Sequence, residues 1–273
     1  MKSKTVLTVL GYGLVGIIPI FPLYWLVISS LKAPEEFRTI PATWWPQDAS
    51  LDAFRTALDV LPFGRGIVNS FIIAGVSTIS VIITSLLAGY VFAKYRFRFK
   101  DQMFWAVIGT MFVPPIITLV PLYWIIQTIG LTNTYTGVIL PWLANAFGIF
   151  LMRQFISELP DELIDAARID GASEFKILYR IITPLVTPAT IALGVFAFIY
   201  YWNNFLWPLS VLQTQEKFPV VLMLNRLLSY STTVQYQNVV LAGAIIASIP
   251  TLIVFFLTQR YFVQGIAKSG VKS

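Results

Sequence analysis

Residues 158–188 read ELPDELIDAARIDGASEFKILYRIITPLVTP, and they belong to the most densely charged part of an otherwise apolar chain. The chain has 19 basic and 13 acidic side chains, and ten of these charges lie between Arg153 and Arg180. Long uncharged runs stand on both sides of this segment. We therefore predict that the segment lies outside an apolar environment, where a soluble partner can reach it.

The local pattern of the segment predicts two short helices joined by a turn. Pro160 suits a first helical position, and Asp161 and Glu162 follow where the helix dipole favours acidic side chains. Gly171 is placed to end the first helix with a positive φ angle, which is costly for other residues. Ser173 can cap the second helix.

One side of the first predicted helix is suited to close contact. Leu159, Leu163 and Ala167 share a face at i, i+4 spacing, with Ala166 beside them. Small residues that would let a partner backbone approach are Ala166, Ala167, Gly171 and Ala172.

The motif Asp165-Ala166-Ala167, followed by Gly171, Ile181, Thr183 and Pro184, resembles the cytoplasmic EAA loop of ABC-importer permeases. That family's pattern is Glu-Ala-Ala, three residues, Gly, nine residues, Ile, one residue and Leu-Pro, and every spacing is kept here. Asp165 stands for the family's Glu, and Thr183 stands for its Leu. The runs DAARIDGAS, WNNFLWP and QRYFVQG, which begin at Asp165, Trp202 and Gln259, are similar to the carbohydrate branch, the maltose-type second permease.

The resemblance implies that residues 157–180 form a cytoplasmic coupling loop whose short helix, 159–170, docks on an ATPase. Partners implied in the same way are a second permease subunit, two ATPase subunits, an extracytoplasmic substrate-binding protein and a sugar. ATP and Mg would be bound by the ATPase and no cofactor by this chain. The ATPase-coupling residues implied are Leu159, Asp161, Glu162, Leu163, Asp165, Ala166, Ala167, Arg168, Asp170, Gly171 and Ala172.

The composition indicates an integral membrane protein. Hydrophobic residues make up 57% of the chain and charged residues only 12%, about half the charged share of soluble domains. The chain has no cysteine and no histidine, which removes disulfides and the commonest general base and metal ligand. The net charge of +6 is interpreted as the topology signal of a protein surrounded by membrane lipid, and not as a nucleic-acid-binding site.

Hydrophobic runs long enough for a membrane helix predict an all-α, polytopic membrane bundle in a single domain, with six transmembrane helices. The uncharged run from Gln102 to Met152 is too long for one span and is divided at a predicted turn, 130–133. The N-terminal run is too long for a signal-peptide core and is predicted to be a span. The predicted spans are 7–31, 67–93, 103–127, 135–156, 183–208 and 239–261.

Basic residues predict the orientation. If both termini lie inside, thirteen basic side chains fall on the cytoplasmic side and six on the outer side. The count places both termini and the charged segment in the cytoplasm, and the resemblance to ABC-importer permeases implies the inner membrane of a prokaryote. The outer loop 32–66 holds a short helix at 51–58 and is either a receptor contact or a plain connector; the outer loop 210–238 is polar.

Several spans carry features that interrupt or specialise them. Pro114, Pro115 and Pro121 are expected to interrupt the third span, since proline removes a backbone donor. The second span has a small, polar face around Ser77, Thr78 and Ser85, which helix packing explains more simply than substrate binding.

The end of the fifth span is the candidate substrate pathway: Tyr200, Tyr201, Trp202, Asn203 and Asn204. Aromatic rings can stack on sugar faces, and asparagine amides can bond hydroxyls in both directions. An interfacial aromatic belt accounts for the rings as well, so both interpretations stay open.

The energy source is expected to lie outside the chain. The middle of each predicted span holds no ionisable side chain that could relay protons, and no phosphate-binding loop is present. The function predicted is the permease subunit of an ATP-driven ABC importer for a carbohydrate, and not an enzyme. The alternatives are an ion-coupled secondary carrier acting alone and a membrane scaffold or sensor.

Overall fold

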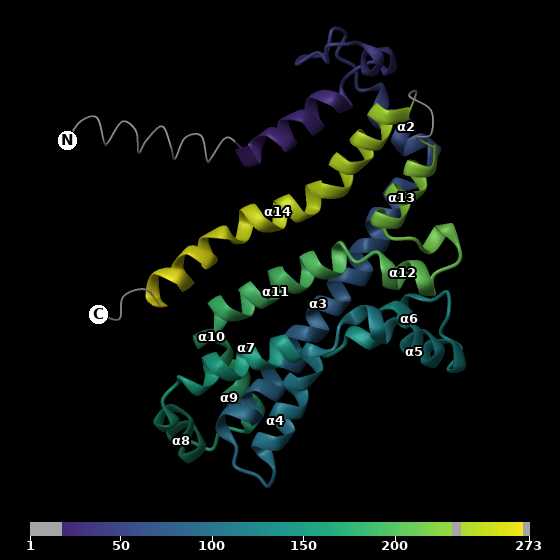
Figure 1. Cartoon of the computed structure of the whole chain (residues 1–273). Coiled ribbons are helices and arrows are strands. Elements are labelled where there is room, and N and C mark those ends of the chain that lie inside the picture. The colour runs from purple at the N-terminus through teal and green to yellow at the C-terminus, as the bar shows by residue number, and fades with distance from the viewer. Residues whose placement is uncertain (1–17, 231–235, 270–273) are drawn as a thin grey trace, which may run out of the picture. The chain divides into compact units, whose positions relative to one another are not determined.

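The computed structural model describes residues 18–230 and 236–269, with side chains for residues 18–229 and 236–259. Every regular element in these ranges is helical (Figure 1), so the predicted all-α class is confirmed. Residues 18–30 are helical, whereas residues 7–17 of the predicted first span lie outside the described ranges. The other elements are η1 (Pro34–Arg38), α2 (Asp52–Val60), α3 (Phe63–Lys94), α4 (Lys100–Gly109), η2 (Thr110–Phe112), α5 (Pro115–Thr128), α6 (Tyr135–Ile139), η3 (Leu140–Trp142), α7 (Ala146–Ser157), α8 (Asp161–Ile169), α9 (Glu174–Ile177), η4 (Leu178–Ile182), α10 (Thr183–Leu185), α11 (Thr187–Trp202), α12 (Leu206–Val211), η5 (Gln215–Lys217), α13 (Val220–Tyr230) and α14 (Gln237–Ser269).

Two described helices are single, unbroken spans by length and composition: α3 and the Gln237–Gln259 part of α14. They correspond to the predicted second and sixth spans. Three further stretches pass the same test only as pairs of helices bent at a short break, which brings the total to as many as five.

The bent pairs show where the helices of the predicted spans are interrupted. The predicted third span turns by 102° between α4–η2 and α5, where Pro114 and Pro115 leave the backbone without donors. Pro121, also expected to interrupt this span, lies inside α5 and does not end it. The predicted fourth span bends by 42° before α7.

The predicted fifth span, 183–208, is also divided. It bends by 85° between α10 and α11, and α11 ends at Trp202. A break at 203–205 then separates α11 from α12. The side chains around this break include two of the candidate substrate residues.

Contacts divide the chain into two units, one formed by Met1–Ile67 with Val220–Ile249 and one by Val68–Pro219 with Pro250–Ser273. In the first, Lys32 is buried, and its Nζ donates to the carbonyl of Thr43 and lies 4.5 Å from the Trp25 ring centroid. The Asn238 amide donates to the Lys32 carbonyl at 3.0 Å. The loop after residue 31 is therefore built around a buried cation.

Glu36 is the second charged residue around which this loop is organised. Its carboxylate accepts from the backbone of Gln47 at 3.1 Å and from the Thr43 hydroxyl at 3.3 Å. Burial raises the pKa of Glu36, but these hydrogen bonds together lower it below its usual value. The short helix predicted at 51–58 is present as α2, and the loop predicted at 210–238 contains the helix α13.

In the second unit, α3 connects two sites at its opposite ends, one at Asn69 and one at Lys94. At a helical rise of 1.5 Å per residue, these two residues are about 37 Å apart along the helix. At one end, the Asn69 amide donates to the carbonyls of Glu216 and Phe218, at 2.8 and 2.9 Å, and accepts from the Tyr135 hydroxyl. At the other end, Lys94 contacts the segment before α8. In Figure 1, α8 and α9 lie far from α6 and α12.

Small residues let α7 cross α3 closely. A Cβ added to Gly89 would lie 2.6 Å from the Met152 Cβ and 2.9 Å from the Arg153 backbone nitrogen. A Cβ on Gly148 would lie 2.3 Å from the Ser85 hydroxyl. This contact supports the packing interpretation of the small, polar face of the second span.

Gly89→Ala is expected to lower the free energy of unfolding by about 1–3 kcal/mol, since the added methyl overlaps the α7 backbone. Gly75→Ala is the matched control in the same helix, because nothing lies within 4 Å of its added Cβ. Thermal unfolding of the two purified variants in the same detergent measures the difference. Equal midpoints would contradict the close crossing of α3 and α7.

Candidate functional site

The charged segment folds as the short helix α8, a turn and the helix α9. The first helix begins at Asp161, with Pro160 as its N-cap, one residue later than predicted. Gly171 has φ +74°, and its N–H donates to the Arg168 carbonyl while the Ala172 N–H donates to Ala167. These two bonds form a Schellman cap, which confirms the predicted role of Gly171 as the helix stop.

The second helix starts as predicted. The Ser173 side chain accepts from the Lys176 backbone N–H at 3.4 Å. Contacts within the segment therefore cap the end of α8 and the start of α9.

The burial of side chains on α8 differs from the pattern that the sequence predicted. Ile164 and Ala167 are buried against the rest of the unit, whereas Leu163 is 44% exposed. Leu163 and Ala167, predicted on one face, therefore differ in exposure. Of the other predicted coupling residues, Leu159 and Ala172 are half-buried, and the exposed ones are Asp161, Glu162, Asp165, Ala166, Arg168, Asp170 and Gly171.

An ion pair joins the start of α8 to the end of α3. The Lys94 side chain is only 6% exposed, and its Nζ lies 2.6 Å from the Asp161 carboxylate. The same Nζ donates to the Leu159 carbonyl at 2.5 Å. The hydrogen bond that Lys94 donates to the Asp161 carboxylate, together with the positive charge of Lys94, lowers the pKa of Asp161. From the sequence, Lys94 was interpreted only as a topology signal at the end of an apolar run.

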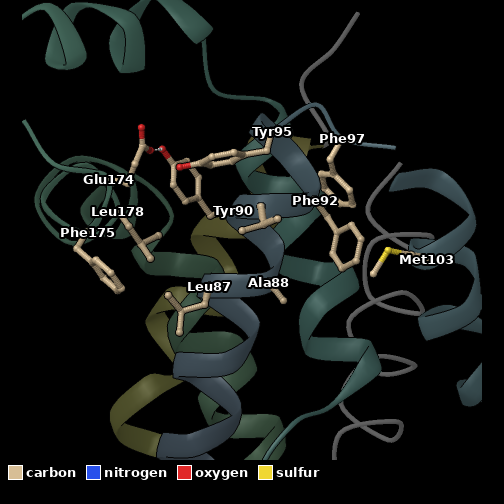
Figure 2. A pocket seen from close by; sticks show the side chains of 11 residues that line it. Leu87, Ala88, Tyr90, Phe92, Tyr95, Phe97, Met103, Glu174, Phe175 and Leu178 are labelled. Carbon is tan, nitrogen blue, oxygen red and sulfur yellow. Dashed lines mark hydrogen bonds between the residues drawn. The ribbon is translucent and has the colours of Figure 1, made fainter. Parts of the chain in front are cut away.

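A second tie runs through Glu174, the first residue of α9. Its carboxylate accepts from Arg168 Nε at 2.9 Å and from the Tyr90 hydroxyl at 2.5 Å (Figure 2). Arg168 also pairs with Asp165 at 3.3 Å, and its guanidinium lies 5.8 Å from the Tyr95 ring centroid. Glu174 thus connects α3, α8 and α9. Sequence reasoning did not select Tyr90 or Glu174, because nothing in their local sequence indicates that they meet.

These contacts explain the strong acidity of Glu174. The hydrogen bond from Arg168 is the largest cause, and the tyrosine hydroxyls and the charge of Arg168 add to it. Together they outweigh partial burial and hold the pKa at about 2. The same carboxylate raises the pKa of Arg168 further. The pair is therefore fully charged near neutral pH.

Large apolar side chains of the segment point into solvent. Ile169 is 87% exposed and Phe175 is 76% exposed, and Leu163 and Tyr179 are exposed as well. Acidic side chains of α8 stand among them. An exposed apolar surface with a polar rim is typical of a protein contact, so the α8 part of this surface, with Leu163 and Ile169, suits a soluble partner.

The candidate substrate residues divide into exposed and buried groups. Tyr200, Asn203 and Asn204 line a pocket of about 420 Å³ with residues of α5 and α12. Trp202 is 1% exposed and packs against Phe71 and Phe198. Trp202 is therefore placed as a core side chain, next to residues that face the pocket.

Tyr200 also faces a second pocket, of about 380 Å³, which it shares with Tyr201 and Asn145. Within the first pocket, the Asn203 amide donates to the Ile199 carbonyl, and the Asn204 side chain accepts from the Trp207 N–H. Each asparagine keeps further hydrogen-bonding capacity. Aromatic rings and amides at one pocket are groups that recognise sugars. The same groups are compatible with an aromatic belt at the membrane–water interface.

Arg153 is an ionisable residue near the end of the predicted fourth span. Its Nε donates to the Phe92 carbonyl at 3.3 Å, and its guanidinium lies 3.9 Å from the Phe104 ring centroid. Since Phe92 precedes Lys94 by two residues, Arg153 lies at the same end of α3 as the charged segment and stabilises the packing there.

Comparison with known proteins adds an independent finding. The model of the family described as binding-protein-dependent transport system inner membrane component matches residues 82–268. The chain is 33% identical over 285 residues to the arabinooligosaccharides transport system permease protein AraQ of Halalkalibacterium halodurans, with 100% of both chains covered. It is 36% identical over 208 residues to the sn-glycerol-3-phosphate transport system permease protein UgpE of Yersinia pestis bv. Antiqua, covering 76% of this chain and 74% of that protein.

The fold is also similar to solved structures. One is the crystal structure of a bacterial ABC transporter involved in the import of the acidic polysaccharide alginate, with a TM-score of 0.82, 23% identity, and coverage of 96% of this chain and 98% of that chain. Another is a bacterial alginate ABC transporter in complex with an alginate pentasaccharide-bound periplasmic protein, with a TM-score of 0.65, 17% identity and 93% of both chains covered.

Acid is expected to loosen α8 from α9. The pKa of Glu174 is about 2 in the folded chain and ordinarily about 4.5, so its contribution to stability is present above pH 4.5 and is lost as the pH falls towards 2. Hydrogen exchange of the amides of residues 161–169, corrected for intrinsic exchange, measures the loss in the detergent-solubilised chain. Glu174→Gln should remove this part of the pH dependence and keep the part that Asp161 contributes. An identical pH profile in the variant would contradict the assignment.

Proposed function

The chain belongs to the family of binding-protein-dependent transport system inner membrane components, and from this premise we propose that it moves a carbohydrate delivered by an extracytoplasmic binding protein. It is a multi-pass membrane permease and not an enzyme, as its permease relatives indicate. The predicted resemblance to ABC-importer permeases is confirmed. Membership of this family excludes the alternatives of a solitary secondary carrier and of a scaffold.

The proposed substrate class is supported by the relatives and by the pocket at Tyr200. The relatives are named as permeases for arabinooligosaccharides and for sn-glycerol-3-phosphate. Both of these substrates are polyhydroxylated compounds. In this chain, Tyr200 would stack on a sugar face while Asn203 and Asn204 bond hydroxyls. Tyr201, whose ring packs against that of Tyr200, would hold it in place, and Trp202 would anchor the end of α11 in the bundle interior.

The proposed assembly comprises this permease, a second permease subunit, two ATPase subunits and the binding protein. ATP and Mg would be held by the ATPase pair, and this chain would bind no cofactor. Both termini and the segment 157–180 would face the cytoplasm, because thirteen basic residues then lie inside and six outside. Six spans are proposed, the first of them at 7–31.

The observation that carries the coupling proposal is the pair of ties between α8 and the end of α3. Lys94 holds Asp161, and Tyr90 with Arg168 holds Glu174. When ATP closes the ATPase pair, α8 would move with its ATPase, and α3 and α9 would move with α8. The bundle would thereby change from inward-facing to outward-facing, with the loop biasing a switch that resides in the helices.

The partner surface would consist of exposed side chains of the segment. Leu163 and Ile169 are exposed apolar groups, and Asp165 and Asp170 are exposed acids beside them. The apolar groups would fill a groove on the ATPase, and the acids would pair with basic side chains at its rim.

Gly171→Val is expected to lower ATP-dependent uptake strongly, because a β-branched side chain at φ +74° costs about 1–3 kcal/mol and distorts the cap of α8. Gly130→Val is the matched control: Gly130 has φ +72° and the same open surroundings, but it lies outside the charged segment. Membrane insertion, co-purification of the ATPase and uptake are measured for both variants in intact cells. Normal uptake by Gly171→Val, or an equal loss in the control, would contradict the coupling role.

Tyr200→Ala is expected to raise the apparent KM for sugar uptake about threefold to tenfold, the effect of losing a ring contact of about 0.5–1.5 kcal/mol. Tyr200→Phe keeps the ring and should retain most of the affinity. Both variants should co-purify with the ATPase as the parent does. An unchanged KM in Tyr200→Ala would remove this residue from the substrate pathway without affecting the coupling proposal.

A further inference from the structure

An apolar groove of about 560 Å³ lies at the Lys94 end of α3. Its walls come from the last turns of α3, the loop after it, the start of α4 and the start of α9 (Figure 2). In this view Leu87, Phe175 and Leu178 stand at one side, and Phe92, Phe97 and Met103 at the other. The groove is thus lined by aliphatic and aromatic side chains, with Glu174 at its edge.

The groove is open rather than internal. Leu87, Val91 and Phe175 line it and are exposed. Apolar surface of this kind, at the end of a helix long enough to cross a membrane, requires a cover of lipid or protein. Since α3 is an apolar span that ends at Lys94, the groove would lie where acyl chains meet the headgroups.

Cations alternate with the residues that line the groove along the loop after α3. Lys94 forms an ion pair with Asp161, and Lys100 donates a hydrogen bond to the Tyr95 carbonyl at 2.9 Å. Arg96 and Arg98 are exposed, and neither forms an ion pair with a carboxylate in the described parts of the chain. Two positive charges therefore remain beside the groove residues Tyr95 and Phe97.

The loop that carries these arginines has a fixed shape. Phe99 has φ +63°, a conformation that is uncommon for a bulky residue and persists only when its surroundings hold it. The Arg98 guanidinium lies 4.7 Å from the Phe99 ring centroid, and Lys100 reaches back to the end of α3. The one carboxylate at the groove, Glu174, is already paired with Arg168. The charge left over at the groove is therefore positive.

We propose that this groove binds an anionic glycerophospholipid of the cytoplasmic leaflet. One acyl chain would lie in the groove, and the phosphate-bearing headgroup would pair with Arg96 and Arg98. Basic pockets at the cytoplasmic ends of membrane helices select anionic headgroups in this way. The inference rests on the proposed cytoplasmic position of the Lys94 end of α3, but not on transport itself. Such a lipid would contact Tyr90 and Phe175, next to the ties that hold α8.

The test uses the full chain reconstituted into vesicles of phosphatidylcholine, doped with a lipid that carries a diazirine in its acyl chain. The probe is either phosphatidylglycerol or phosphatidylcholine with identical acyl chains. After illumination, labelled peptides are mapped by mass spectrometry. Labelling of residues 87–103 by the anionic probe is expected to exceed labelling by the zwitterionic probe by about fivefold or more, the effect of one to two cations near a membrane surface.

Three variants separate charge from shape. Arg96→Gln with Arg98→Gln should bring the two probes to equal labelling. Arg38→Gln with Arg65→Gln removes two exposed arginines from elsewhere in the chain and should leave the preference unchanged. Val91→Trp fills the groove and should reduce labelling by both probes. Circular dichroism of each variant confirms that the fold is kept.

Two outcomes would overturn the proposal. Equal labelling of residues 87–103 by both probes in the parent chain would mean that this surface only contacts bulk lipid. An unlabelled groove, with labelling elsewhere on the chain, would mean that another segment of this chain or a second copy of it covers the groove. Because the readout is labelling and not uptake, a failure here is distinct from a failure of the proposed transport function.

Discussion

The carboxylate of Glu174 accepts hydrogen bonds from Tyr90 on α3 and from Arg168 on α8, and the rest of the charged segment is arranged around this contact. Charge-assisted hydrogen bonds are shorter and stronger than neutral ones, and this set lies where an apolar helix leaves the membrane. Lys94 adds a second connection through Asp161. These contacts connect α8 to the span α3 in addition to the burial of Ile164 and Ala167, so a force applied to α8 would be transmitted to α3.

The apolar environment of the spans explains the other main features of the fold. Helices in lipid associate through close backbone approach, which Gly89 and Gly148 provide between α3 and α7. Ser77, Thr78 and Ser85 are buried on α3, so small polar residues serve packing there. Bends occur where prolines remove donors, as at Pro114 and Pro115. The bend before α11 and its end at Trp202 give the aromatic cluster its place at the pocket.

In the candidate substrate surface, neighbouring residues of one aromatic run have different roles. Tyr200 and Asn203 reach a pocket, whereas Trp202 is buried against Phe71 and Phe198. A helix places neighbouring residues on different faces, so a run of aromatics cannot all meet one ligand. The opposite end of α3 has a comparable division, where Lys94 forms an ion pair and Arg96 is exposed.

The sequence by itself determined the helical class, the apolar spans, the family resemblance, the cap at Gly171 and the cap at Ser173. These depend on composition and on short-range backbone preferences, which local sequence specifies. The tertiary structure decided which face of α8 is buried, how far each proline-containing span bends, and that Lys94 and Tyr90 meet residues 67 and 84 positions away. Contacts at such separations follow from how the helices pack, because local propensity does not say which side chains will meet across the bundle.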